Sequence, residues 1–339
     1  MTKAQINNLI MKGTFPGSFG KPSLIETHIS WVVLSDRFVY KIKKPIQYSF
    51  LDFSTIERRK YYCEREIELN RRLTENIYLD VQPIRENTGR FFVGGEAGEI
   101  VDYAVRMQKQ DRNRQMNILL LNNSVTNDDI GQLAEKIAAF HKNAVIIHQK
   151  DFMDVQKKFN DLEEERNYLN QYLNGNSSII IDHAIDISNK FMERNKELLS
   201  SRLKEGFFRD CHGDLHSRNI FLLSSPQPFD CIEFNDDFRQ IDVLNEIAFL
   251  CMDLDSFGKQ DLSELFLSYY NNLFPAMKTN EDRMLFVYYK SYRSNIRAKV
   301  NSLRARGAME GADRMNALSE AGKYLQLMDK YISMLSLPY

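Results

Sequence analysis

A histidine, an aspartate and an asparagine lie close together in residues 212–219, which have the form H-G-D-x-x-x-x-N. A carboxylate such as that of Asp214 can accept a proton from a hydroxyl that attacks a phosphoryl group. An amide oxygen such as that of Asn219 is a hard ligand that suits Mg²⁺. A polar turn before a hairpin would explain His-Gly-Asp alone, but one short loop that carries both groups would hold nucleophile and metal in register. We expect Asp214 to be the catalytic base and Asn219 to bind the metal.

A second metal ligand is expected at the end of the hairpin that follows, where four acidic residues stand: Asp230, Glu233, Asp236 and Asp237. Residues 229–234 read as an apolar strand, and a carboxylate that emerges from a buried strand is poorly explained by solubility alone. Glu233 is the first choice for this ligand and Asp230 the second. At least two of the four are expected to be turn or helix-capping residues.

The first hundred residues contain most of the strand signals. Antiparallel strands are expected at residues 24–29, 31–34 and 37–42, followed by a helix over residues 54–73 that Asp52 or Ser54 could cap. Two further strands are expected at 90–93 and 100–107. Lys41 and Lys43 lie on one face of the third strand because strand side chains alternate. Either could hold nucleotide phosphates if a helix glutamate paired with it.

Helical periodicity dominates after residue 107, beyond a polar connection at residues 108–115. Helices are expected from residue 128 and at 151–173, 184–204, 242–254, 260–273 and 281–332. One hairpin, with strands at 219–223 and 228–234, interrupts them. The sequence therefore predicts an α+β protein with a small antiparallel-sheet lobe over residues 1–107 and a large, mainly helical lobe over residues 108–339.

Three motifs of the helical half resemble those of the aminoglycoside phosphotransferase and choline kinase-like family. That family has an HGDxxxxN loop, an "ID-aromatic" metal motif and a D-x-x-x-D-L-A helix start. Residues 212–219, 232–234 and 241–248 are similar to these, but Glu233 and Glu246 stand where aspartate is usual. Residues 25–31, 40–45 and 51–55 are similar to a bacterial subgroup of the family, in which some members carry a fused P-loop ATPase domain. The resemblance spans nearly the whole chain and brings no established substrate.

This resemblance implies a bilobal protein kinase-like fold and further site residues. The family pattern favours Lys41 over Lys43 as the phosphate lysine, and Glu66 over Glu64 as its partner. The loop over the nucleotide has no glycine here, and His28 and Ser30 are candidates to approach the phosphates, although a hairpin turn explains them equally well. The adenine is expected against residues 103–107, so that Met107 is a candidate to contact it.

Composition excludes several other classes of protein. Hydrophobic residues make up 43% and charged residues 27% of the chain, which is ordinary for a globular protein and argues against disorder. The net charge of −1 gives no reason to expect binding to nucleic acid or to a membrane surface. The four cysteines are widely spaced and predict buried free thiols, not a zinc site. No signal peptide or membrane span is recognised, and we expect a cytoplasmic protein.

A late helical segment is basic, with Lys290, Arg293 and Arg297 on one face at i, i+3 and i+7. Arginines in an acceptor cleft would suit a phosphate or carboxylate, so Arg293 and Arg297 are candidates to bind the acceptor. A solvated basic face is the alternative. An anionic or neutral hydroxylated acceptor is favoured over a polycationic one.

These residues together predict an ATP- and Mg²⁺-dependent phosphotransferase that acts on a hydroxyl of a small molecule. Three alternatives stay open: a nucleotide-binding pseudokinase that docks a protein partner, a protein kinase, and a nucleotidyl transferase.

Overall fold

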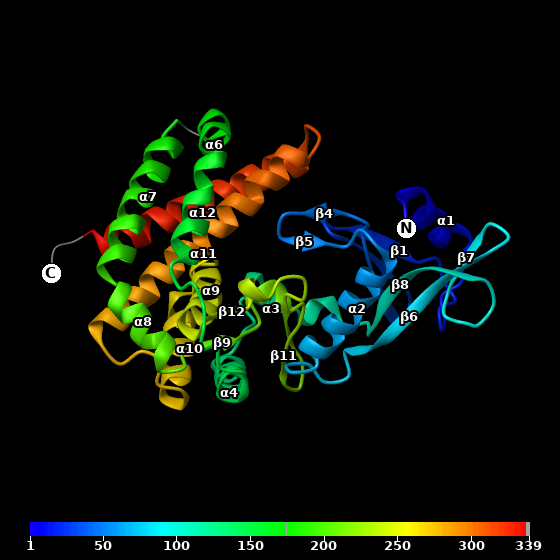
Figure 1. Ribbon diagram of the computed structural model, residues 1–339, viewed down its shortest axis with the longest axis horizontal. Coiled ribbons are helices and arrows are strands. Elements are labelled where there is room, and N and C mark those ends of the chain that lie inside the picture. The colour runs from blue at the N-terminus through cyan, green and yellow to red at the C-terminus, as the bar shows by residue number, and fades with distance from the viewer. Residues whose placement is uncertain (174, 337–339) are drawn as a thin grey trace. The chain divides into compact units, whose positions relative to one another are not determined.

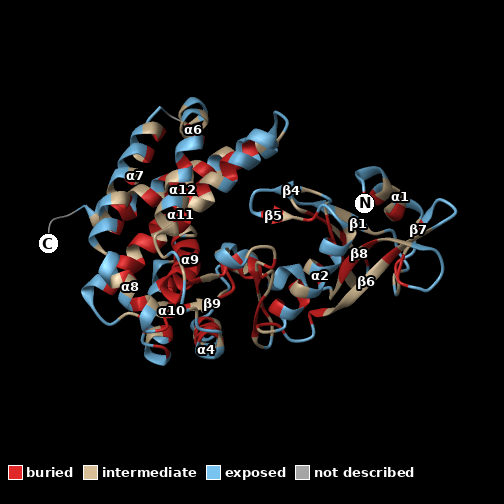
Figure 2. Cartoon of the chain, in the orientation of Figure 1, coloured by how far each residue is buried: buried red, intermediate tan, exposed pale blue. Residues whose placement is uncertain are grey.

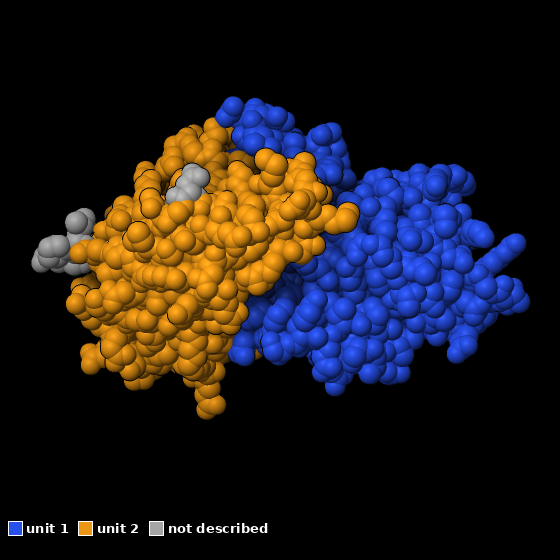
Figure 3. Space-filling model, turned by 90° about the horizontal axis from the view of Figure 1, so that it is seen from above, with its two compact units in different colours: residues 1–124, 212–214, 218–239 blue, residues 125–211, 215–217, 240–339 orange. Residues whose placement is uncertain are grey.

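The computed structural model describes residues 1–173 and 175–336 (Figure 1). The chain divides into two compact units, which Figure 3 shows in different colours. Unit 1 contains residues 1–124, 212–214 and 218–239, and unit 2 contains residues 125–211, 215–217 and 240–339. Unit 1 thus combines the expected small lobe with the hairpin and most of residues 212–219. The lobe boundary between residues 107 and 108 stays a prediction.

Unit 1 is built on a six-stranded antiparallel sheet with the strand order β1-β2-β3-β8-β6-β7. The strands of this sheet are β1 (Ser23–Glu26), β2 (Ser30–Leu34), β3 (Phe38–Lys43), β6 (Tyr78–Asn87), β7 (Arg90–Val93) and β8 (Glu99–Gln108), and a separate short hairpin consists of β4 (Gln47–Tyr48) and β5 (Leu51–Asp52). The sequence did not predict β6, although it lies between β8 and β7. Its run contains Pro83 and several charged residues, which weaken the strand signal.

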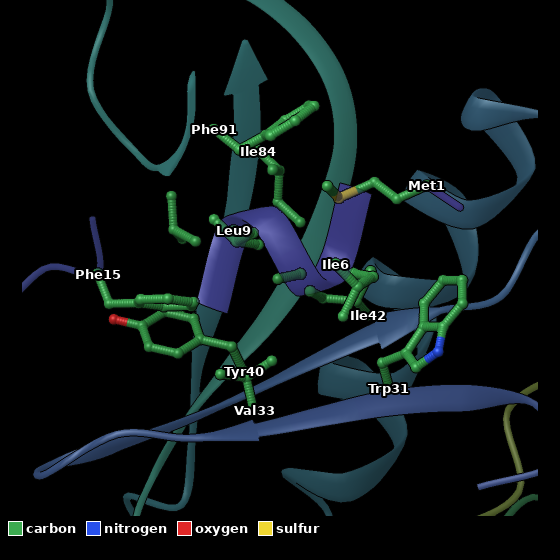
Figure 4. Packing of buried hydrophobic residues seen from close by; sticks show 12 residues of the cluster. Met1, Ile6, Leu9, Phe15, Trp31, Val33, Tyr40, Ile42, Ile84 and Phe91 are labelled. Atoms are coloured by element: carbon green, nitrogen blue, oxygen red, sulfur yellow. The ribbon is translucent and has the colours of Figure 1, made fainter. Parts of the chain in front are cut away.

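Two helices cover the two faces of the sheet. Alternate residues of β3 point to opposite faces, and Tyr40 and Ile42 pack with Ile6 and Leu9 of α1 (Lys3–Lys12; Figure 4). The intervening Lys41 and Lys43 face α2 (Ile56–Asn70), which supplies their partner glutamate. The helix α1 was not predicted. α2 begins after Thr55, whose side chain accepts from the N–H of Arg58, so that neither Asp52 nor Ser54 is the capping residue.

The remaining elements of unit 1 follow the sheet or surround the hairpin: η1 (Arg112–Arg114), α3 (Met116–Leu121), β10 (Ile220–Leu222), β11 (Pro226–Pro228) and η4 (Asp236–Phe238). The 3-10 turn η3 (Ser217–Asn219) lies where the chain returns from unit 2 to unit 1. A hairpin is present in the predicted region, but its second strand spans Pro226–Pro228 and shares only Pro228 with the strand predicted at 228–234. The strand ends there because Asp230 adopts φ +63°, a left-handed conformation that an extended strand cannot contain.

Unit 2 is mainly helical and also holds a two-stranded sheet of β9 (Phe208–Asp210) and β12 (Gln240–Asp242). Its helices are α4 (Asn127–Asn143), α5 (Asp154–Asn160), η2 (Asp161–Glu165), α6 (Arg166–Tyr172), α7 (Ser177–Arg194), α8 (Lys196–Lys204), α9 (Val243–Ser256), α10 (Gln260–Leu273), α11 (Asn280–Gly307) and α12 (Ala312–Leu335). Every residue of α9 from Val243 to Asp255 is buried (Figure 2), so α9 is the central helix of the unit.

Several predicted helices of unit 2 have different bounds in the structure. The helix expected at residues 151–173 is three shorter elements, α5, η2 and α6. The one expected at 184–204 begins earlier, at Ser177, and is divided at Asn195 into α7 and α8. The one expected at 281–332 is broken before Gly311, whose φ of +145° favours glycine. Among the described residues, no helix combines the length and the apolarity needed to cross a membrane.

Candidate active site

Asp214 and Asn219 are joined directly in unit 1. The side-chain nitrogen of Asn219 donates to the Asp214 carboxylate at 2.9 Å and to the Asp214 carbonyl oxygen at 3.1 Å. Both bonds use the amide nitrogen, so the amide oxygen of Asn219 is the atom that can face a metal. Asn219 is 8% exposed, whereas Asp214 is only partly buried. The loop therefore holds a partly exposed carboxylate in a set position beside a hard oxygen ligand.

His212 orients the backbone of this loop. Its Nε2 donates to the carbonyl oxygen of Phe229 at 2.9 Å, and its Nδ1 accepts the N–H of Asp214 at 3.3 Å. This pattern assigns the neutral tautomer with the proton on Nε2. The side chain is fully buried, and burial lowers the pKa of His212 to about 4 against the opposing charge of Asp214. His212 is therefore a neutral structural residue and not a proton carrier at neutral pH.

Gly213 allows the loop of residues 212–219 to turn close to Ile232, Phe238 and Arg239. It adopts φ +88°, and a Cβ at this position would lie 2.9 Å from the carbonyl oxygen of Phe238. Any side chain would meet backbone there. The glycine of the H-G-D motif is thus required by backbone conformation and by close packing.

Lys41 lies at the centre of a set of ion pairs in unit 1. Its Nζ is 2.8 Å from Oε1 of Glu66 and 2.5 Å from Oδ1 of Asp230. Burial opposes the charge of Lys41, but Asp230, Glu66 and Glu233 raise its pKa well above the ordinary value. Burial alone would raise the pKa of Glu66, yet Lys41 and Lys43 lower it to about 2. The ammonium of Lys41 and the carboxylate of Glu66 are therefore both charged at neutral pH.

The two candidates for the second metal ligand differ in exposure. The Asp230 side chain is 43% exposed, and its N–H donates to the Tyr78 hydroxyl at 3.0 Å. The neighbouring Phe229 N–H donates to the Asn219 carbonyl oxygen at 2.8 Å, which fixes this backbone beside the loop. Glu233 is 3% exposed and makes a very short ion pair with Lys43. Asn219 and Asp230 thus supply oxygen ligands of the type that Mg²⁺ prefers, and accessibility favours Asp230 over Glu233.

Burial raises the pKa of Glu233, Lys43 opposes this rise, and the charge of Glu66 adds to it, so that the net change is upward. The other two acidic candidates belong to η4, whose N-cap is Asn235. Asp236 binds Arg239 at 2.7 Å and Arg65 at 3.4 Å. Asp236 and Asp237 are therefore turn residues, as was expected of two of the four.

The sequence did not indicate two residues, Asn70 and Tyr78, that bind the backbone of Asp230 and Cys231 after the hairpin. Asn70 is buried on α2, where its amide accepts the N–H of Cys231 at 2.9 Å and donates to the carbonyl oxygen of Glu66 at 2.8 Å. Tyr78 accepts from Asp230, as described above. The i+4 spacing of Glu66 and Asn70 was the available signal for Asn70, because it places both on one helix face. Tyr78 lies on β6, the strand that was not predicted.

The three other nucleotide candidates lie on or beside the sheet of unit 1. Ser30 pairs with Lys43 across β2 and β3, so the two share a sheet face, and Ser30 is buried. His28 is exposed on the β1–β2 turn. Met107, Phe221 and Phe229 all pack against the buried cluster that contains Tyr78 and Val105, and the rings of the two phenylalanines stack at 4.7 Å. Contact of these three residues with a nucleotide stays a prediction.

In unit 2, α9 anchors the part of residues 212–219 that belongs to this unit. The Ser217 N–H donates to the carboxylate of Asp253 at 2.8 Å, and the His216 ring lies 5.2 Å from that of Phe249. Glu246, which stands where the resembling family has aspartate, is fully buried close to His141 and Cys211. These contacts make α9 the support of this short segment.

The face of α11 with Lys290, Arg293 and Arg297 is not fully solvated, because Arg293 is only 6% exposed and Lys290 and Arg297 are partly buried. Its Nε donates to Asn245 at 2.7 Å, and its guanidinium lies 4.8 Å from the centre of the Phe249 ring. Lys290 is paired with Asp255 at 2.5 Å, and Arg297 lies over the Tyr324 ring at 5.3 Å. The binding of an acceptor by Arg293 and Arg297 stays a prediction.

No family model matches the sequence. Curated relatives are uncharacterized proteins of Mycobacterium bovis and Mycobacterium tuberculosis, 32% identical to this chain over 311 residues. The matched region is 89% of this chain and 59% of each relative, so the chain spans less than two thirds of their length.

Solved structures of phosphotransferases have the same fold. A choline/ethanolamine kinase family protein of Mesorhizobium loti superposes with a TM-score of 0.52 at 11% identity, over 98% of this chain and 97% of that one. Aminoglycoside 2'-phosphotransferase-IIIa, solved with GDP, has a TM-score of 0.50 at 14% identity over 97% of both chains. Spectinomycin phosphotransferase, solved with AMP, has a TM-score of 0.50 at 12% identity, over 93% of this chain and 92% of that one. The chain therefore has the protein kinase-like fold of the aminoglycoside phosphotransferases and choline/ethanolamine kinases, as predicted.

Proposed function

We propose that the protein transfers the γ-phosphoryl group of ATP to a hydroxyl of a small molecule in a Mg²⁺-dependent reaction. The observation that carries this proposal is one set of side chains in unit 1. The carboxylate of Asp214 accepts a hydrogen bond from Asn219, and Lys41 forms ion pairs with both Glu66 and Asp230. Phosphoryl transfer needs a carboxylate for the attacking hydroxyl, oxygen ligands for a metal and a lysine for the phosphates. The phosphotransferase fold supports the same reaction class.

Each side chain has a defined role in this proposal. Asp214 accepts the proton of the acceptor hydroxyl. The hydroxyl oxygen forms a bond to the γ-phosphorus, while the bond between the γ-phosphorus and the oxygen that leaves with ADP breaks. Lys41, held by Glu66, donates hydrogen bonds to the α- and β-phosphates. Asn219 and Asp230 would hold Mg²⁺, which when bound neutralises charge on the phosphate oxygens.

The acceptor is proposed to be a small hydroxylated molecule, with an anionic or neutral one favoured. This preference rests on Arg293 and Arg297 of α11, and a screen that found only polycationic acceptors would contradict it. Their intramolecular contacts in unit 2 give them a packing role as well.

The test follows transfer of label from γ-phosphoryl-labelled ATP, with Mg²⁺, to a panel of small hydroxylated compounds. Asp214→Asn should lower the transfer rate by roughly 10²- to 10⁴-fold, because it removes the proton acceptor. Asp261→Asn, at an exposed position on α10, is the matched control and should retain full activity. Undiminished transfer by Asp214→Asn would refute the role of the base. ATP binding without transfer to any compound would favour the pseudokinase alternative. In a parallel assay with α-labelled ATP, transfer of the label would favour a nucleotidyl transferase.

A further inference from the structure

Two lysines, not one, hold the buried glutamate of α2. The carboxylate of Glu66 uses one oxygen for each of them, because Oε1 is 2.8 Å from Nζ of Lys41 and Oε2 is 2.8 Å from Nζ of Lys43. Lys41 continues to Asp230 at 2.5 Å, and Lys43 continues to Glu233. These five side chains form one unbroken row of ion pairs from Asp230 to Glu233, which we call the charge row.

The two ends of the charge row differ in access to solvent. At one end, the side chain of Asp230 is 43% exposed and that of Lys41 is 13% exposed. At the other end, Lys43 and Glu66 are fully buried and Glu233 is 3% exposed. Ligands can reach the first end, whereas the second end is surrounded by protein. The buried end therefore suits a supporting role better than direct contact with a metal or a nucleotide.

The support has a clear physical purpose. If Asp230 binds a metal, Lys41 loses one of its two carboxylate partners and Glu66 alone holds its ammonium. A carboxylate paired with one cation can rotate about its last bond, but one that has a cation on each oxygen is fixed in its plane. Lys43 fixes the second oxygen. Because Lys43 shares the single charge of Glu66 with Lys41, Glu233 supplies the second carboxylate that balances the buried ammonium of Lys43 and holds it from its other side.

We propose that Glu233 is a positioning residue. Acting through Lys43, it fixes the carboxylate of Glu66 and thereby the ammonium of Lys41, and it does not ligate the metal. This inference rests on the proposed function, in which Lys41 holds the phosphates of ATP. It reverses the preference that the sequence alone suggested, in which Glu233 was the first choice as metal ligand.

The experiment separates nucleotide binding from metal binding in the full chain. Calorimetry measures the Kd of ATP in the presence of a chelator, and electron paramagnetic resonance measures the affinity of Mn²⁺ for the protein–ATP complex. Glu233→Gln should weaken metal-free ATP binding by roughly 10- to 100-fold, the size expected when one hydrogen bond to a charged group is lost, and leave Mn²⁺ affinity near that of wild type. Asp230→Asn should give the opposite pattern. Glu68→Gln, on the same helix as Glu66 and 69% exposed, is the control and should change neither.

A double-mutant cycle with Lys43→Met tests whether the effect passes through the lysine. The double variant should bind ATP no more weakly than either single variant, because both remove the same support. It also leaves neither member of the Lys43–Glu233 pair charged, which keeps the test decisive should a single variant fold poorly. Additive losses, or weakened Mn²⁺ affinity with unchanged ATP affinity in Glu233→Gln, would overturn the proposal. If wild type itself fails to bind ATP, the proposed function fails instead.

Discussion

The buried imidazole of His212 makes the stability of the protein depend on pH in a defined direction. Its Nδ1 accepts the Asp214 N–H and its Nε2 donates to Phe229, so a second proton on Nδ1 would place two N–H groups against each other. The proton is therefore disfavoured in the folded state, in which the pKa is about 4, compared with 6.5 in the unfolded chain. Above pH 6.5 this residue costs no stability. As pH falls from 6.5 to 4 the unfolded state takes up the proton alone, and stability is lost.

The magnitude follows from the difference between the two pKa values. Each pH unit within that window costs about 1.4 kcal/mol, so the full loss is about 3 kcal/mol. Between pH 7 and pH 5 the expected loss is about 2 kcal/mol, which is a large share of the roughly 5–15 kcal/mol that stabilise a typical protein. Because the imidazole is fully buried, solvent screening does not reduce this value appreciably.

Two measurements test this expectation. Nuclear magnetic resonance of the six histidines, with the His212 signal assigned by its loss in His212→Gln, should show one imidazole that titrates near pH 4. Urea unfolding at pH 7 and pH 5 should show a loss of stability that is about 2 kcal/mol smaller in His212→Gln than in wild type. His148→Gln, at an exposed histidine, is the control and should behave as wild type. Titration of His212 near pH 6.5, or equal pH dependence in His212→Gln and wild type, would refute the reasoning.

Two further predictions concern stability. Gly213→Ala should cost about 1–3 kcal/mol, because φ of +88° and the close Phe238 carbonyl both oppose a Cβ; an unchanged Tm would contradict this. Arg202→Met should cost about 3–5 kcal/mol, measured by denaturant unfolding, because it leaves the buried carboxylates of Asp242 and Asp282 without the guanidinium that now binds them at 2.7 Å. A loss below about 1 kcal/mol would show that these carboxylates find other partners.

Regular hydrophobic patterns made much of the fold predictable. The helix at residues 260–273 has the bounds that the sequence indicated, and the strand at 90–93 does as well. The strand β6 was missed because proline and charged residues hide a strand that is stabilised by β8 and β7 on either side. The helix α1 was missed because only a few of its residues, among them Ile6 and Leu9, face the sheet. Tertiary packing supplies what the local pattern of these two elements lacks.

The sequence by itself determined that Asp214 and Asn219 lie together in the site. Asp214 and Asn219 are five residues apart, and that spacing in one short loop is enough to bring them together. The resemblance to a known family also indicated the pair of Lys41 and Glu66, whereas only the tertiary structure showed which acidic residues the two lysines meet after the hairpin. Lys41 and Asp230 are separated by 189 residues, and Lys43 and Glu233 by 190, so no local pattern could pair them. Whether a carboxylate faces solvent or a buried ammonium depends on the surrounding chain. This difference in exposure is the reason why we propose Asp230 as the metal ligand and Glu233 as the supporting residue.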